Sequence, residues 1–240
     1  MRVGIFVRVS CPQSWGPSGY RDMVVLMAEF PDRSETTRLI EQAVRGDQRA
    51  LGALLGRHRE RLRRMVALRL DWRLRGRVDP SDVLQEACLD AARRLPEYHQ
   101  NPSMPFFLWL RFLAGQRLVD EHRKHLGAAA RHAGREIGLN HGALPETSSA
   151  ALAAQLLGRL TTPSQAAIRA ERKIRLQEAL NRMDPIDREV LALRHFEELS
   201  NTEAAAVLGL DKSAASKRYA RALIRLKEIL ASMPGGLDED

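Results

Sequence analysis

Apolar residues recur along most of the chain at intervals of three and four, which is the spacing of amphipathic helices. The first stripe begins after Ser34, pauses at Gly46 and Asp47, and resumes as far as Val66, so it predicts two successive helices. No segment shows the alternation of β-branched and aromatic residues that a half-buried strand requires. The pattern therefore predicts an all-α fold.

Two Asp-Pro pairs and one further proline predict the starts of three more helices, since aspartate caps free backbone amides and proline suits a first turn. Asp79-Pro80 opens a helix that Pro96 should end, because proline lacks an amide hydrogen. Pro105 opens another that runs to about Lys124, and Asp184-Pro185 opens one in the second half. The apolar stripes are expected at Val83, Leu84, Ala87, Cys88, Ala91 and Leu95, and later at Ile168, Ile174, Leu176, Leu180 and Met183.

The helical stripes fall into two parts, residues 33–125 and 163–232, which predicts two small helical domains. Between them, residues 126–162 shift to Ala, Gly, His, Ser and Thr, the composition of a flexible linker. A short helix is expected inside that linker, from Ala150 to Leu160.

The two ends of the chain show no helical periodicity. Residues 1–32 carry Pro, Gly and Ser among scattered apolar residues, and residues 233–240 form a short tail. Both segments are expected to be disordered. Met23 and Met27 are alternatives to Met1 as the true start.

Charge and cysteine content narrow the class of protein. Lys and Arg number 38 against 30 Asp and Glu, and the resulting +8 suits a polyanionic partner, although many basic proteins bind no nucleic acid. Cys11 and Cys88 lie far apart, and the seven histidines show no metal-ligand spacing, so we expect no disulfide, metal, cofactor or enzyme activity. No apolar run is as long as a membrane span, so a cytoplasmic protein is expected.

A capping box and a glycine predict a helix-turn-helix near the C-terminus. Ser200 and Glu203 have the spacing at which each side chain binds the other residue's backbone amide, and the short helix should end at Gly209. The second helix is expected to bury Ala215, Tyr219, Ala222, Leu223, Leu226 and Leu230. Its other face carries the small polar and basic residues that entry into a DNA groove requires, namely Lys212, Ser213, Ser216, Lys217, Arg218 and Arg221. A helical hairpin with a solvated basic face is the alternative.

Residues 180–226 resemble region 4 of sigma-70 family factors, the extracytoplasmic-function (ECF) group in particular. The resemblance is carried by Met-Asp-Pro-Ile-Asp-Arg-Glu-Val at 183–190, Leu-Arg-His-Phe at 193–196 and Ala-Ala-Ala-Val-Leu-Gly at 204–209. It implies that the helix-turn-helix reads the minus-thirty-five promoter element. Ala-Ala-Ser-Lys-Arg at 214–218 departs from the family's usual Thr-Val-Lys-Ser-Arg, which leaves the promoter sequence open.

The helix after Asp79 resembles region 2.2 of the same family along the segment Asp-Pro-Ser-Asp-Val-Leu-Gln-Glu-Ala at 79–87. In that family, region 2.2 docks on the β′ clamp helices of RNA polymerase. The resemblance assigns this docking to Asp79, Asp82, Gln85 and Glu86. On the residues alone, a solvated acidic face is the alternative.

The helix after Pro105 resembles regions 2.3 and 2.4, which melt and bind the minus-ten element. The implied DNA-binding residues are Trp109, Phe112, Gln116, Asp120, Arg123 and Lys124, with Gln116 where asparagine is usual. An aromatic pair at helical spacing more often belongs to a core. The loop at 98–104 matches the position of the family's base-capturing loop. Nine arginines from Arg57 to Arg77 fall on all sides of a helix and its exit, so most are expected to be solvated and a minority to meet phosphates.

The resemblance covers residues 35–125 and 163–230 in the family's order. It implies a sigma factor that binds core RNA polymerase through the β′ clamp and the β flap, binds promoter DNA, and joins the nucleoid in the holoenzyme. An anti-sigma factor is a further candidate partner, and no membrane is implied. Two alternatives stay open: a helix-turn-helix regulator that does not replace a sigma factor, and a helical scaffold that binds only protein.

Overall fold

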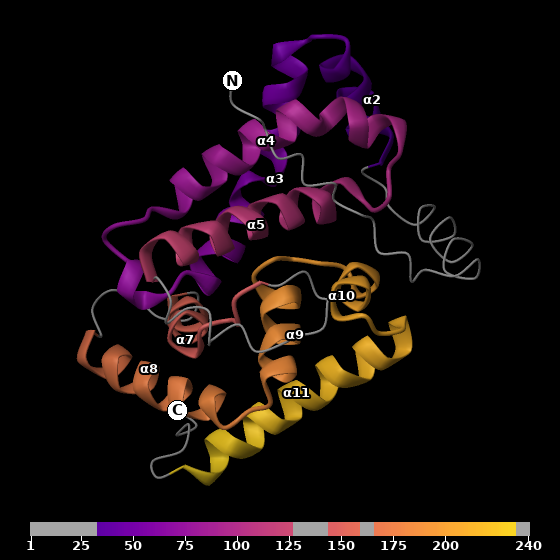
Figure 1. Ribbon diagram of the computed structural model, residues 1–240. Coiled ribbons are helices and arrows are strands. Elements are labelled where there is room, and N and C mark those ends of the chain that lie inside the picture. The colour runs from indigo at the N-terminus through magenta and orange to yellow at the C-terminus, as the bar shows by residue number, and fades with distance from the viewer. Residues whose placement is uncertain (1–32, 127–143, 159–165, 234–240) are drawn as a thin grey trace.

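The computed structural model describes residues 33–126, 144–158 and 166–233, and these residues form helices and short turns without a strand (Figure 1). The first group of helices lies above the second in Figure 1. The first group is α2 (Arg33–Val44), α3 (Gln48–Arg69), the 3-10 turn η1 (Trp72–Leu74), α4 (Pro80–Gln100) and α5 (Phe106–Leu126). The second is α7 (Ser149–Gly158), α8 (Ala166–Asn181), α9 (Pro185–His195), α10 (Asn201–Leu208) and α11 (Lys212–Ser232). The expected all-α fold is confirmed.

Local capping residues set the helix starts that the sequence predicts. The carboxylate of Asp47 accepts hydrogen bonds from the amides of Arg49 and Ala50, at 2.8 and 3.1 Å. The carboxylate of Asp184 accepts from the amide of Ile186 at 3.0 Å, at the start of α9. Each bond satisfies an amide that has no partner within its helix.

The expectation that Pro96 ends its helix is wrong, because α4 continues through it to Gln100. Pro96 is exposed, so water can reach the carbonyl group that its missing amide leaves unbonded. One turn further on, Tyr98 is buried and its hydroxyl donates to the carbonyl of Met104 at 2.8 Å. This contact fixes the last turn of α4 against the following loop.

Two expected core residues lie at the surface instead. Ile174 on α8 is 59% exposed, because it lies six positions before buried Leu180 and a helix turns by about 100° per residue, which points the two side chains in different directions. Leu223 on α11 is 39% exposed, since it follows Ala222, which points into the core. The stripe on α4 is as expected, with Cys88 half-buried at its edge. Ile168 lies outside the residues whose side chains are described.

The described part of the predicted linker contains a packed helix. The short helix expected there is α7, whose Leu152 is fully buried. The amide of Ser148 donates to the carbonyl of Leu68 at 2.9 Å, which ties the approach to α7 to the end of α3. The rest of the predicted linker and both predicted tails lie almost wholly outside the described residues.

A network of charges, three of them buried and one half-buried, joins the two groups of helices. Arg69 of α3 pairs with Glu189 of α9 and lies 2.6 Å from Glu197, in the turn after α9. Arg111 of α5 lies 2.7 Å from the same Glu197 carboxylate, and the Thr147 hydroxyl donates to Glu189 at 2.5 Å. Burial alone would raise the pKa of Glu197, but the two guanidinium groups outweigh it and lower this pKa. We call Arg69, Arg111, Glu189 and Glu197 the junction network.

Two further arginines of α3, Arg61 and Arg64, also connect the first group of helices to the second. Arg61 donates to the carbonyls of Glu197 and Glu198 at 2.9 and 3.1 Å, and Arg64 pairs with the Glu198 carboxylate at 2.6 Å. As expected, most of the nine arginines between Arg57 and Arg77 are exposed. Arg69 is the exception and is fully buried, because Glu189 and Glu197 from the second group of helices compensate its charge.

Candidate nucleic-acid and polymerase interfaces

The predicted helix-turn-helix forms from α10, Gly209 and α11. The amide of Ser200 donates to the Glu203 carboxylate at 2.8 Å, and the amide of Glu203 donates to the Ser200 hydroxyl at 3.1 Å, so both halves of the capping box are present. Gly209 has a φ of 64°, in the left-handed region that glycine enters without steric cost. The Asn201 side-chain amide donates to the carbonyl of Lys212 at 2.7 Å and holds the start of α11 against α10.

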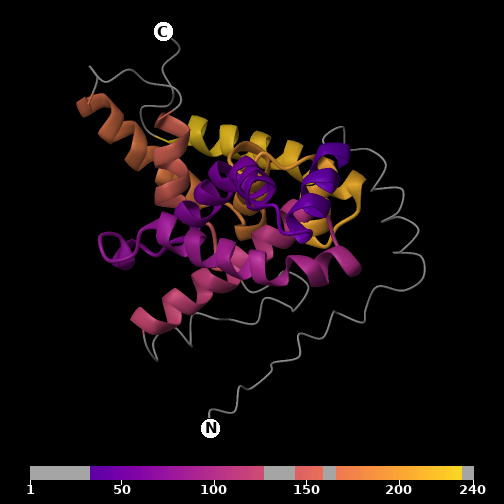
Figure 2. The same ribbon diagram turned by 90° about the horizontal axis from the view of Figure 1, so that it is seen from above.

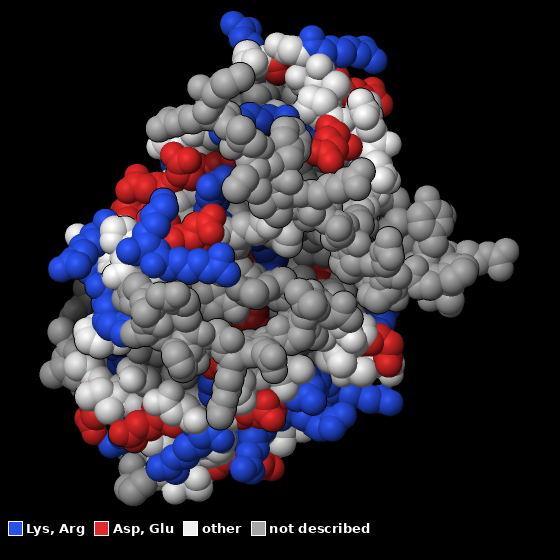
Figure 3. Space-filling view, viewed as in Figure 1, with Lys and Arg blue, Asp and Glu red and all other residues white. Residues whose placement is uncertain are grey.

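The first turns of α11 present the side chains that the sequence assigned to DNA. Ala215 and Ala222 are buried, whereas five of the six predicted residues are exposed: Lys212, Ser213, Ser216, Lys217 and Arg221. Basic side chains project at the lower right of Figure 3, over the first half of α11. Small and basic residues on one exposed face can enter a DNA groove and meet its phosphates.

The sixth predicted residue of α11, Arg218, is held within the fold. Its guanidinium group donates to the carboxylate of Asp187 on α9 at 2.8 Å, and the residue is half-buried. The next residue, Tyr219, makes a hydrogen bond of 2.9 Å to Nε2 of His195. These two contacts hold α11 against α9, so Arg218 helps to orient α11 in this structure.

The acidic residues at the start of α4 face outward. Asp82, Gln85 and Glu86 are exposed, while Val83 and Leu84 between them are buried. Asp79 is also exposed and caps the helix by accepting from the amide of Ser81 at 2.6 Å. That hydrogen bond lowers the pKa of Asp79. All four residues predicted to dock on polymerase are therefore accessible from solvent.

The predicted minus-ten residues divide between core and surface along α5. Trp109 is half-buried and stacks on Tyr98, with ring centroids 4.6 Å apart, and Phe112 packs on the core. Gln116 is half-buried one turn further along. Beyond it, Asp120 is partly exposed, and Arg123 and Lys124 lie largely in solvent. Trp109 and Phe112 therefore pack against the core, which is the alternative role that the sequence left open for them.

A small cavity of about 160 Å³ lies where the start of α4 meets the end of α5. Its lining combines predicted polymerase-binding residues, Asp82 and Glu86, with predicted minus-ten residues, Asp120 and Lys124. Figure 3 shows acidic and basic side chains crowded together on this side of the molecule, at the left. Sequence reasoning did not find that these two predicted surfaces are neighbours, because they belong to different helices.

The described residues contain no cluster of three or more potential metal ligands. Among them, no helix is long and apolar enough to cross a membrane.

Comparison with known proteins gives the family. Residues 173–226 match the family model described as Sigma-70, region 4. This match begins within α8, includes α9 and α10, and ends within α11. The chain is 33% identical over 195 residues to the ECF RNA polymerase sigma factor SigD of Mycobacterium tuberculosis, covering 81% of this chain and 84% of that protein. It is 29% identical over 194 residues to the RNA polymerase sigma factor CnrH of Cupriavidus metallidurans, covering 80% of this chain and 92% of that protein.

A solved structure of CnrH, in complex with the cytosolic domain of CnrY, is also similar. It superposes with a TM-score of 0.50 at 25% identity and covers 83% of this chain and 99% of that one. The chain belongs to the sigma-70 family of RNA polymerase sigma factors, in its ECF group. It is a protein of transcription initiation, and its second group of helices carries the DNA-binding region 4.

Proposed function

We propose that this chain binds core RNA polymerase and directs it to promoters by holding two promoter elements at once. The first group of helices would melt and bind the minus-ten element through α5, and α11 would read the minus-thirty-five element. One observation carries the proposal: a sigma-family chain presents two separate exposed surfaces, at the end of α5 and the start of α11, in the family's order.

Docking on polymerase is assigned to the start of α4, through Asp79, Asp82, Gln85 and Glu86. Their exposure supports the role, because a docking surface must be reachable in the free protein. Their charge suits a basic partner surface. The Asp82→Lys, Glu86→Lys double variant should not co-elute with core polymerase in gel filtration. Co-elution at wild-type affinity would remove this assignment.

A protein partner of the anti-sigma type is part of the proposal. The similar structure of CnrH was solved with the cytosolic domain of a second protein bound to it, and this chain shares that fold. The β flap of polymerase is the other proposed protein contact, through the region 4 helices.

In vitro transcription tests the central proposal. Purified chain is added to core polymerase from its own source on genomic fragments, and start sites are mapped. The expected result is initiation at defined sites that core enzyme alone does not use. A chain that binds duplex DNA without polymerase and never selects a start site would instead be a helix-turn-helix regulator.

A further inference from the structure

The turn between α3 and α4 exposes the largest apolar side chain on the described surface. Trp72, the first residue of η1, is 75% exposed, whereas the other large aromatic residues of the described chain lie in or against the core. An exposed tryptophan leaves a wide apolar ring in water without a packing gain. The position therefore points to a ligand that a flat ring can contact.

The backbone beneath Trp72 is held firmly. The Asp71 carboxylate caps η1 by accepting from the amide of Arg73 at 2.9 Å. Leu70, Leu74 and Val78 are buried on both sides of the exposed ring and anchor the turn to the core. Trp72 is thus displayed from a fixed support, which reduces the entropy that binding a ligand costs.

Arginines are near neighbours of Trp72 along the chain, at positions 73, 75 and 77. Arg73 pairs with Asp71 at 2.8 Å, whereas Arg75 and Arg77 are exposed and form no ion pair with another described residue. An exposed aromatic ring with exposed arginines a few residues away is typical of surfaces that bind single-stranded nucleic acid, with a base on the ring and phosphates on the cations. A base inside a duplex is already stacked on its neighbours, so the ring suits an unpaired one.

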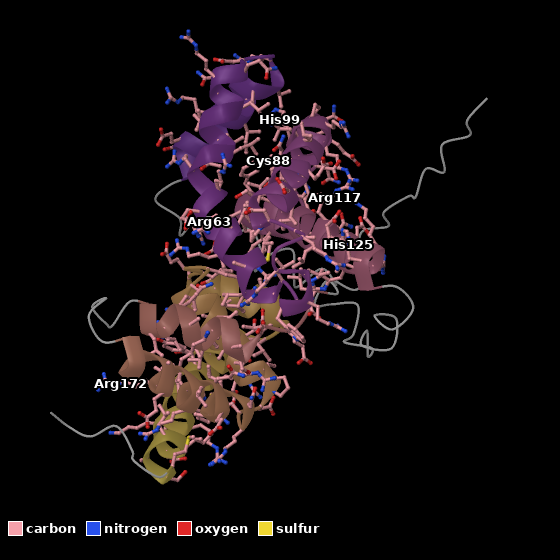
Figure 4. All side chains as sticks on the ribbon, turned by 90° about the vertical axis from the view of Figure 1, so that its left-hand side faces the viewer. Arg63, Cys88, His99, Arg117, His125 and Arg172 are labelled. Carbon is pink, nitrogen blue, oxygen red and sulfur yellow. The ribbon has the colours of Figure 1, made fainter. Side chains whose placement is uncertain are left out.

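The turn lies directly beside the end of α5. The amide of Asp71 donates to Nε2 of His122 on α5 at 3.3 Å, and Arg77 lines the same cavity as Asp120 and Lys124. Figures 1 and 2 both place the turn on the same side of the molecule as the C-terminal end of α5. Figure 4 looks onto this side and shows Arg117 and His125 of α5 close together there.

We propose that Trp72, Arg75 and Arg77 form a second contact for the opened DNA strand, continuous with the minus-ten surface of α5. Trp72 stacks on one unpaired base, and the two arginines bind flanking phosphates. The inference rests on the proposed function, because it needs an opened strand at the end of α5. Arg77 stands at the border with Asp82 and Glu86, so polymerase is the competing occupant of this turn.

The test uses holoenzyme and a promoter located by the start-site mapping above, with its minus-ten segment pre-opened by non-complementary bases. Trp72→Ala should weaken binding to this template on the order of 10-fold or more, and Trp72→Phe should retain most of the affinity. The Arg75→Ala, Arg77→Ala variant should lower the slope of log affinity against log salt by about 1 to 1.5, for two single-strand phosphates that it no longer binds.

The Arg45→Ala, Arg49→Ala variant is the matched control, since it removes the same charge from exposed positions in the turn before α3 and in its first turn, at the other end of that helix from Trp72. It should leave both readouts unchanged. Wild-type binding by the Trp72 and Arg75/Arg77 variants, while Arg123→Ala, Lys124→Ala weakens binding, would overturn the inference and leave the proposed function standing. Loss of polymerase binding in the absence of DNA would also overturn it and make the turn a polymerase contact. If the wild-type chain selects no start site, the proposed function itself fails.

Discussion

His122 connects α5 to the turn that follows α3 through one hydrogen bond. Its Nε2 accepts the amide hydrogen of Asp71, which requires an imidazole without a proton on that nitrogen. Burial lowers the pKa of His122 and Arg73 adds to this effect, while Asp71 opposes it. The folded protein therefore resists protonation of this side chain.

The stability of the protein should consequently depend on pH through His122. As the pH falls below 6.5, the ordinary pKa of histidine, the unfolded chain gains a proton that the folded chain resists, so stability decreases until the lowered folded pKa is passed. His122→Gln keeps an acceptor without this titration. Urea unfolding at pH 7.5, 6.5 and 5.5 should show a smaller decrease for the variant. Parallel curves for the two proteins would contradict the assignment.

Periodicity predicted the exposed face at the start of α11, although it placed the exposed Leu223 in the core, and it could not predict the partners of the side chains on that face. Lys217 and Arg221 are exposed as the spacing requires. Arg218 is an arginine like Arg221 and was also predicted to bind DNA, yet it forms an ion pair with Asp187 of α9. A helical pattern fixes the direction of a side chain within its own helix and says nothing about the helix packed against it.

At the scale of the element, helix boundaries set by local capping were predictable from sequence. The capping box of α10 and the aspartates before α3, α4, α9 and α11 act on amides two or three residues away. The extension of α4 past Pro96 was not predictable, because it depends on Tyr98 and its contact with the following loop.

Ser200→Ala should destabilise the second group of helices. The change leaves the amide of Glu203 without its capping acceptor, which costs about 0.5–2 kcal/mol. Thermal unfolding should show the loss, and Ser200→Thr should largely avoid it. Ser232→Ala, at the exposed far end of α11, is the control: its hydroxyl donates to the carbonyl of Ile229 within its own helix at 2.8 Å and caps no free amide, so the change should alter stability by no more than about 0.5 kcal/mol. Equal effects of the two alanine changes would argue against the cap.

The basic face of α11 should determine the salt dependence of promoter binding. The Lys217→Ala, Arg221→Ala variant should weaken holoenzyme binding to duplex minus-thirty-five DNA and reduce the salt slope by about 0.9 for each phosphate that the face no longer neutralises. Arg172→Ala, Lys173→Ala removes equal charge from exposed positions on α8 and serves as the control. A slope unchanged from wild type would exclude phosphate binding by this face.

At the scale of the whole molecule, the junction network joins parts of the chain that sequence reasoning treated separately. Arg69 and Arg111 belong to the first group of helices, and Glu189 and Glu197 to the second. Each charge is costly to bury alone and acceptable only with its partners. No local pattern signals this pairing, because an arginine on a basic helix normally remains in solvent.

Removing one partner from the junction network should therefore lower the free energy of unfolding far more than removing a surface charge beside it. Glu197→Gln leaves Arg69 and Arg111 buried with one carboxylate fewer and should lower the free energy of unfolding by about 3–5 kcal/mol in urea denaturation. Glu198→Gln, at the adjacent position with a half-exposed carboxylate paired to Arg64, should cost about 1 kcal/mol or less.

The same carboxylate makes the junction sensitive to acid. Because the folded pKa of Glu197 lies below its ordinary 4.5, its contribution to stability is complete above that pH and is lost as the pH falls through the folded value. Small-angle scattering should show the wild-type chain expanding over that range, with Glu197→Gln already expanded at neutral pH. A compact Glu197→Gln chain with wild-type stability would mean that apolar packing, and not the buried charges, holds the two groups of helices together.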